Sequence, residues 1–462
     1  MQTAFMPAKA RWWSRGSGTR PALRRPVAAL VLGLAAAVPA HAADCEASLL
    51  RELGWRIEER PQPLATIAGG LPCARADLAE AQAAGDLRIV LPAGSDPALR
   101  ARTLRAALAD PATRCAYGFL LGDATRRAAE RLQANPGYRF SALQLGWIGF
   151  GAGGARSQGW ERTRSFGRRY QPSGSHLAAI ETFYSGRVRS ECGVGRQVAQ
   201  LATLAELFGP AFETEFTAGE LSIGTFVSLH DSDSVLLGRA AGDVLGDAKA
   251  RRAAALGPQA LVGLPGFVEH VFDRDSLDDI NNQAENFVVT AVAPEAAAAL
   301  RRHGGFEHYD RINREVWRLA QDLAPPGRRG FERLLYERDP RLRAGLDAEA
   351  AAVVARIDAL LDDPFYRGFE IYVHPMGIRP IGYHIVRLLD RNPRTPYATE
   401  LVLHNMHTTL FRRWMAWRLR TCGMAEDAAV RLAAEAIPHS GRTGFGPAPA
   451  PAPAPAGGAA VQ

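Results

Sequence analysis

The stretch SECGVGRQVAQLATLAELFGP, residues 190–210, decides how the middle of this chain folds. Its apolar residues recur at spacings of four, three, four and three, as on one face of a helix: Val194, Val198, Leu201, Ala205 and Phe208. Gly209 and Pro210 end this helix, and Ser190 is the expected N-cap. The pattern therefore predicts that Cys192 lies in the first helical turn.

A cysteine in the first turn of a helix is placed for nucleophilic chemistry. The helix dipole and the unpaired backbone N–H groups favour the thiolate over the thiol. The same N–H groups can stabilise the oxyanion of an acyl-transfer intermediate. The alternative interpretation is a structural cysteine, buried or disulfide-bonded, near the start of a helix.

A thiol nucleophile needs a base, and the sequence offers histidines and a carboxylate. None of the downstream histidines lies in a papain-type local signature: His230, His270, His303 and His308. Glu285 precedes Asn286 and the apolar run FVVTAV at 287–292, which predicts a buried strand. A charge at the mouth of a buried strand is costly without a partner or a task, and burial adapts a carboxylate to act as a base. The alternative is a surface glutamate at a strand end.

Five short motifs occur in an order that resembles a known family. YQPS at 170–173 and IETFY at 180–184 precede Glu191-Cys192, and FDRDSLD at 272–278 leads into AENFVV at 284–289. Together they resemble the bacterial protein-glutamine γ-glutamyltransferases of the spore-coat type, over residues 165–310. The chain departs from that family by its leader, by its helical flanks and by missing tryptophans, with Asn282 where one would stand.

The resemblance implies an α+β fold with a papain-like cysteine catalytic core flanked by helical regions. It implies that Cys192 is the nucleophile, that Glu285 is its carboxylate partner and that Glu191 assists. His303, followed by Gly304 like a histidine of the family, and Asn286 are the implied substrate-binding residues. The implied partners are protein substrates bearing Gln and Lys, joined by a γ-glutamyl-ε-lysine bond through a thioester, without a metal or organic cofactor.

Two other functions use the same residues differently. A cysteine amidase or peptidase acting on cell-wall peptide would pass the acyl group from Cys192 to water. A non-catalytic envelope protein would hold Cys192 in a disulfide. Ammonia release with and without an added amine distinguishes the hydrolase from the transferase. Thiol titration of the folded protein distinguishes the non-catalytic protein from both enzymes.

Residues 1–42 have the three parts of a secretory signal peptide. Six basic residues and no acidic one precede the apolar run PVAALVLGLAAAV at 26–38, and AHA at 40–42 is the expected cleavage site. The run is too short to span a bilayer comfortably, so we expect no stable membrane insertion after cleavage, the alternative being an uncleaved anchor. The predicted location is periplasmic or secreted. Without the leader the net charge falls from +7 to +1, which leaves no electrostatic case for nucleic acid.

Export to an oxidising compartment favours disulfides among the five cysteines. Because catalysis needs a thiolate, we predict that Cys192 stays unpaired. Cys45, Cys73, Cys115 and Cys422 are then structural, and nearness in sequence suggests a Cys45–Cys73 bond.

Composition and periodicity divide the chain into five parts. They are the signal peptide at 1–42, an N-terminal helical region at 43–160, the catalytic core at 161–311, a C-terminal helical region at 312–440 and a disordered Pro/Ala tail at 441–462. The clearest predicted helices in the flanks are Pro97–Leu108, Ala124–Gln133, Leu346–Leu361 and Thr399–Arg420.

Three further motifs resemble ligand-binding sites, but each lacks a feature that its ligand requires or has a simpler structural explanation. GFGAGG at 149–154 lacks the helix that a dinucleotide site requires, which favours a loop. The acidic run at 273–282 lacks EF-hand spacing, which favours a solvated loop over a calcium site. Glu400, His404 and His407 would share a helical face as metal ligands, but the leucines around them favour core packing. We therefore predict no metal site.

Overall fold

The computed structural model describes residues 40–435 with gaps at 71, 141–144, 147–148, 151–157, 164–168, 225–232, 237–256, 272–283, 324–342, 375, 383–397 and 404–406. The predicted signal peptide up to residue 39, the acidic run at 273–282 and the Pro/Ala tail lie outside the described residues. Among the described residues, no helix combines the length and the apolar character needed to cross a bilayer.

The N-terminal part mixes helices with a small sheet. Its elements are α1 (Ala40–Glu52), β1 (Arg56–Arg60), β2 (Thr66–Gly69), α2 (Leu78–Ala83), β3 (Leu87–Pro92) and α3 (Pro97–Ala109). Strand β3 lies between β1 and β2, parallel to β1 and antiparallel to β2. The predicted helix α3 is confirmed, and the Asp96 side chain caps it. The sheet escaped prediction because β1 is the polar, largely exposed sequence RIEER, without hydrophobic alternation.

Two long helices form the centre of the protein. Helix α4 (Pro111–Ala134) contains the predicted segment Ala124–Gln133, and it packs along α6 (Cys192–Phe208). Gly209 ends α6 with a φ of 54°, a left-handed conformation that favours glycine. The elements around α6 are α5 (His176–Ser185), α7 (Phe212–Glu215) and the short strands β4 (Tyr138–Phe140), β5 (Leu145–Gly146), β6 (Gly149–Phe150), β7 (Trp160–Arg162), β8 (Arg169–Pro172), β9 (Val188–Ser190) and β10 (Ile223–Gly224).

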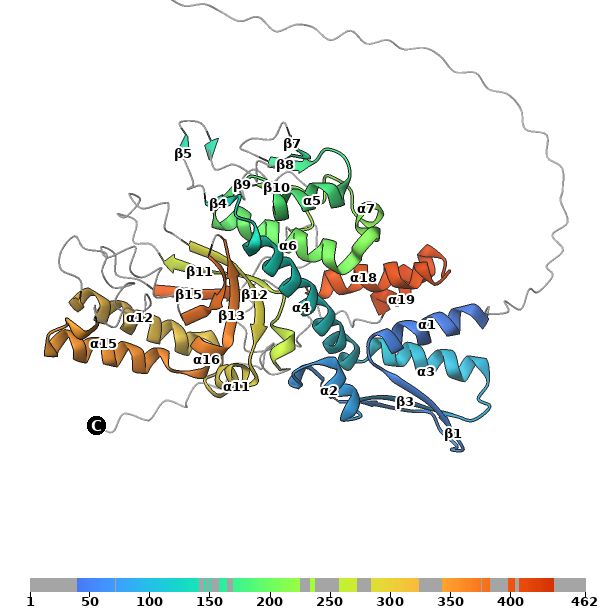
Figure 1. Cartoon of the computed structure of the whole chain (residues 1–462). Helices are drawn as coiled ribbons and strands as arrows, with labels where there is room; N and C mark the ends of the chain where they lie inside the picture. The colour runs from blue at the N-terminus through green and yellow to red at the C-terminus, as the bar shows by residue number, and fades with distance from the viewer. Residues whose placement is uncertain are drawn as a thin grey trace, which may run out of the picture. The chain divides into compact units, whose positions relative to one another are not determined.

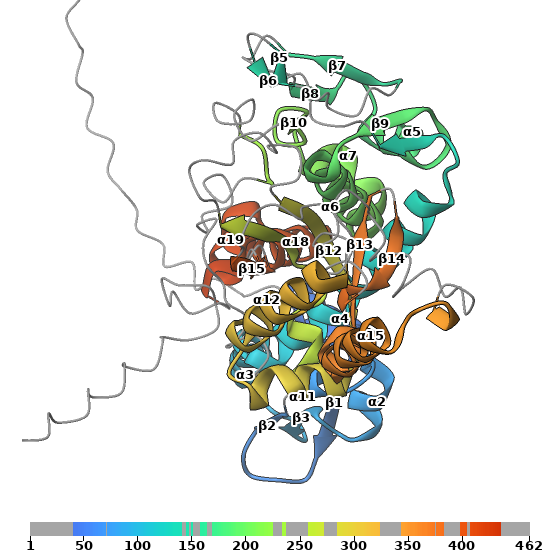
Figure 2. The ribbon, with the colours of Figure 1, turned by 90° about the vertical axis from the view of Figure 1, so that its left-hand side faces the viewer.

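A five-stranded antiparallel sheet lies against α6, in the order β14-β13-β12-β11-β15. Its strands are β11 (Pro265–Val271), β12 (Ala284–Val292), β13 (Phe369–Val373), β14 (Gly377–Pro380) and β15 (Ala398–Leu403). Val288 and Tyr372 belong to the hydrophobic core that includes α6, whereas Phe287, Val289 and Ile371 belong to a second core with helices from the C-terminal part. The sheet therefore separates two cores. Figures 1 and 2 show α6 on one side of this sheet and the helices at 306–323 and 348–361 on the other.

The C-terminal part contributes both helices and strands. Its helices are α11 (Pro294–Arg302), α12 (Phe306–Leu323), α15 (Ala348–Leu361), α16 (Pro364–Gly368), α18 (His407–Thr421) and α19 (Glu426–Glu435). The predicted helix at 346–361 is confirmed as α15, with Asp347 as its N-cap. The prediction of one helix over Thr399–Arg420 is wrong in its first part, because ATELVL at 398–403 pairs with β11 as a strand. The architecture is mixed α+β.

Because residues 398–403 form the strand β15, Glu400 and His407 are not on one helix, as the possible metal site required. Glu400 belongs to β15 and His407 begins α18, so the two do not share a helical face, and His404 lies outside the described residues. In the described part of the chain, no group of three or more His, Cys, Asp or Glu residues could hold a metal ion.

The cysteines form two disulfides, Cys45–Cys422 and Cys73–Cys115. The prediction that Cys192 stays outside a disulfide is confirmed. The suggested Cys45–Cys73 pair is wrong, because α1 packs against α18 and brings Cys45 to the far end of the chain. The two disulfides fit an oxidising compartment.

Candidate functional site around Cys192

The first turn of α6 is capped by Glu191, not by Ser190 as the sequence suggested. The Glu191 carboxylate accepts hydrogen bonds from the backbone N–H of Gly193 at 2.5 Å and of Val194 at 2.6 Å. Ser190 instead ends β9, and its hydroxyl shares a 2.8 Å hydrogen bond with the Tyr138 hydroxyl. The helix start is thus fixed by a side chain next to the cysteine.

This cap changes two expectations about the site. The N–H groups of Gly193 and Val194 are bound to Glu191, so they cannot also bind an oxyanion while that carboxylate holds them. Glu191 is adjacent to Cys192, as predicted, but its observed task is to cap the helix. Donors for an oxyanion must therefore come from elsewhere around the sulfur.

Cys192 is half-buried at the first position of α6 and lies outside both disulfides. The side-chain amide of Asn286 donates a hydrogen bond to its sulfur, with 3.6 Å between Nδ2 and Sγ. Two segments 94 residues apart in sequence are thereby joined. The structure thus places Asn286, which the resemblance assigned to substrate binding, directly against the predicted nucleophile.

Arg196 follows Cys192 by one helical turn. Burial lowers the pKa of Arg196, while the negative charges of Glu191 and Cys192 act to raise it. A nearby cation favours a thiolate over a thiol, as does the position at a helix N-terminus. Arg196 is therefore a source of positive charge beside Cys192.

A histidine that the sequence did not single out also reaches this helix. His374 follows the last residue of β13 and is only 2% exposed. A Cβ atom placed on Gly195 would lie 2.5 Å from the Cβ of His374, closer than real side chains approach. Gly195 thus allows His374 to pack directly on the first turn of α6.

The surroundings of His374 hold its ring in place. The ring stacks on Tyr138 with 3.7 Å between centroids, and it forms a hydrogen bond with the backbone of Arg139. Burial lowers the pKa of His374 to about 4, so the ring is neutral at physiological pH. In the described structure its Nε2 atom is buried without a hydrogen-bond partner.

Glu285 and His303, the other predicted site residues, are placed differently. Glu285 is described by its backbone only, as the residue that precedes Asn286 in β12. His303 ends α11 and stacks on His308 with 3.8 Å between centroids. Helix α11 contributes to the core on the far side of the sheet from α6. The described contacts therefore bring Asn286, and not His303, to Cys192.

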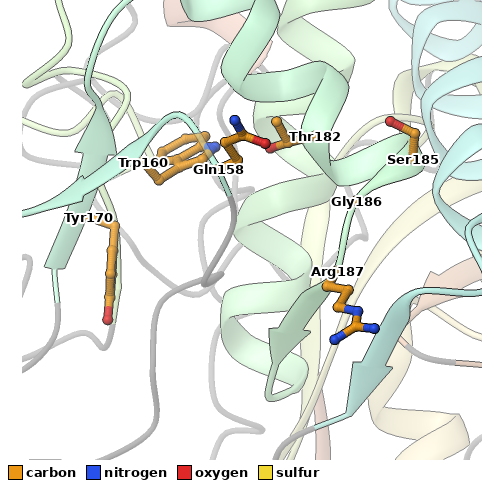
Figure 3. A pocket seen from close by; sticks show the side chains of 7 residues that line it. All are labelled: Gln158, Trp160, Tyr170, Thr182, Ser185, Gly186 and Arg187. Carbon is orange, nitrogen blue, oxygen red and sulfur yellow. The ribbon is translucent and has the colours of Figure 1, made fainter.

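A cavity of about 820 Å³ lies near the start of β9, the strand that leads to Cys192. Figure 3 shows Gln158, Trp160 and Thr182 together on one side of it, with Arg187 apart from them. Its described lining is Gln158, Trp160, Tyr170, Thr182, Ser185, Gly186 and Arg187. A polar cavity with aromatic walls at this place is large enough for a peptide side chain.

Comparison of the chain with protein families, with curated proteins and with solved structures finds no match.

Proposed function

We propose that the protein is a cysteine-dependent acyltransferase, a protein-glutamine γ-glutamyltransferase with a papain-like core. The observation that supports this most is a half-buried thiol, Cys192, in the first turn of α6 and in contact with the Asn286 amide. Helix α6 also packs on an antiparallel sheet, as the proposed core requires. The resemblance of the motifs around Cys192 and Glu285 supplies the choice of glutamine and lysine as substrates.

The proposed reaction has two half-reactions on one sulfur. In the first, Cys192 loses a proton and its sulfur attacks the γ-carboxamide carbon of a glutamine. The C–N bond breaks, ammonia leaves with the proton, and a thioester remains. In the second, a lysine ε-amine attacks the thioester, loses a proton, and the C–S bond breaks to restore the thiol. Asn286 Nδ2, which contacts Sγ, is suited to stabilise the oxyanion in both steps.

The test is ammonia release from a glutamine-containing protein, measured with and without an added primary amine. A transferase gives amine-modified protein in step with the ammonia, since the amine competes with water for the thioester. Ammonia release without amine incorporation identifies a hydrolase acting through the same cysteine. No ammonia from any glutamine donor, with Cys192 shown to be a thiol, contradicts the proposal.

The two carboxylates of the resemblance should differ in importance. If Glu285 is the base, as the resemblance implies, Glu285→Gln should lower the rate of ammonia release by roughly 10²–10⁴-fold, the usual scale for removal of a general base. Glu191→Gln should lower it only in part, because the single amide oxygen can still accept from one of the two N–H groups that the two carboxylate oxygens of Glu191 now bind, Gly193 or Val194. Initial rates of both variants at matched concentrations of folded protein check this. An unchanged rate in Glu285→Gln removes that residue from the mechanism.

A further inference from the structure

We infer that His374 is the base of this site, the group that takes the Cys192 proton and delivers it to the departing ammonia. The inference rests on the proposed function, and it gives to His374 the role that the sequence resemblance gave to Glu285. Two observations support this role for His374: the position of His374 at the end of the sheet, and its packing on α6.

The ends of β12 and β13 bring Asn286 and His374 to the same face of the sheet. The strands are antiparallel, and the last pair of their register at this end is Val288 with Tyr372. Asn286 in β12 and His374 just after β13 lie two residues beyond this pair, on the same side of it. Side chains two residues apart on an extended chain share a face, and Val288 and Tyr372 both belong to the core that includes α6. Asn286 and His374 therefore both lie toward α6, which the contact of Asn286 with Cys192 and the packing of His374 on Gly195 also show.

Both neighbours meet the same turn of α6. Asn286 contacts Cys192, and His374 packs on Gly195, three residues later. Positions three apart lie on one side of a helix. Cys192, Asn286 and His374 thus come from α6, from β12 and from the residue that follows β13, and the first turn of α6 contacts both of the other segments.

The hydrogen bonding of His374 leaves one ring nitrogen, Nε2, able to accept a proton. Because Nε2 has no hydrogen-bond partner among the residues that the structure describes, the hydrogen bond with the Arg139 backbone uses Nδ1. This bond raises the pKa of the ring, as expected for an Nδ1–H that donates to a carbonyl. Nε2 then carries the lone pair. A buried polar atom without a partner costs folding free energy, which indicates a task that the resting structure does not show.

The turn of α6 against which His374 packs carries titratable groups. Glu191, Cys192 and Arg196 are its titratable groups, and Tyr138 covers the ring from β4. No hydrogen bond joins Nε2 to Sγ in this structure. Proton transfer then requires a bridging water or a rotation of either side chain, and catalytic hydrogen bonds are often formed only with substrate.

In each half-reaction, His374 accepts one proton and gives one proton back. Nε2 accepts the proton of the Cys192 thiol as the sulfur attacks the carboxamide, and it releases this proton to the ammonia that leaves. In the second half-reaction Nε2 accepts a proton from the lysine amine and returns it to Sγ when the C–S bond breaks. Each half-reaction ends with a neutral imidazole, and neither step needs an oxidant or a cofactor.

The test compares wild type, His374→Gln and Glu285→Gln, with His308→Gln as the matched control on the other side of the sheet. Two rates are measured on folded protein: ammonia release, and alkylation of Cys192 by iodoacetamide from pH 3 to pH 10. We expect His374→Gln to lose roughly 10²–10⁴-fold in ammonia release. It should also lose the alkylation that occurs below the ordinary thiol pKa of about 8.5. His308→Gln should keep the wild-type alkylation profile. Loss of the low-pH alkylation in Glu285→Gln, with the profile of His374→Gln unchanged, assigns the base to Glu285 instead.

The alkylation profile also separates the inference from the proposed function. In wild type, Nε2 accepts protons only above the His374 pKa of about 4, so alkylation should rise near that pH and again near the thiol pKa. A single rise near the thiol pKa overturns the inference, even if His374→Gln fails to fold. A wild-type profile in folded His374→Gln overturns it as well. A profile that depends on His374 without any ammonia release supports the base and contradicts the transferase.

Discussion

Replacing Cys192 with serine is expected to lower the rate of ammonia release by on the order of 10⁶-fold, the scale seen when an enzyme loses its nucleophile. A serine hydroxyl gives far less of the anionic nucleophile than a thiol, because an alcohol ionises far less readily than a thiol. Because Cys192 is half-buried and outside the disulfides, the substitution should leave the free energy of unfolding within about 0.5 kcal/mol of wild type. Ammonia release and urea unfolding check the two expectations.

The matched control for Cys192→Ser is Ser190→Ala, two residues earlier. Its hydroxyl bonds to Tyr138 and not to the sulfur, so it should change activity far less than Cys192→Ser. Mass spectrometry of wild type with a glutamine donor should find an acyl adduct on Cys192 that the serine variant lacks. Retention of full ammonia release in Cys192→Ser would exclude the thiol mechanism.

The features that local sequence patterns could predict are those set by a few adjacent residues. The apolar spacing after Cys192 predicted α6, and Gly209 ends it as expected. The run after Asn286 predicted β12. The place of Cys192 outside the disulfides followed from an odd number of cysteines in an exported chain and from the need for a thiolate. In each case the signal lies within one helix, one strand or one residue type.

The features that escaped prediction depend on pairing between distant segments. His374 lies 182 residues after Cys192, and only the register of β12 with β13 brings it to α6. The segment around His374 has no periodic pattern, and Gly195 alone hints that a side chain approaches α6. The cap by Glu191 was missed because glutamate is an uncommon N-cap beside a serine that is a common one. Strand pairing and tertiary packing override such local preferences.

The disulfide between Cys45 and Cys422 should contribute more to the free energy of unfolding than the disulfide between Cys73 and Cys115. It closes a loop of 377 residues, against 42 for Cys73–Cys115. If a disulfide acts by restricting the unfolded chain, their removal should lower the free energy of unfolding by about 6 and about 4 kcal/mol respectively. The paired variants Cys45→Ala/Cys422→Ala and Cys73→Ala/Cys115→Ala provide the comparison in urea unfolding.

The order of these two losses tests the mechanism of stabilisation. Helix α1 and helix α18 also meet through an ion pair between Glu52 and Arg418, but an exposed pair of this kind contributes little. Without the bond between Cys45 and Cys422, α1 is held mainly by its buried apolar face, so it should also lose amide-exchange protection first. Equal losses in the two paired variants would contradict the loop-entropy account. A larger loss for Cys73→Ala/Cys115→Ala would instead assign the stabilisation to packing around the second disulfide, in the core that also contains Phe287 and Val289.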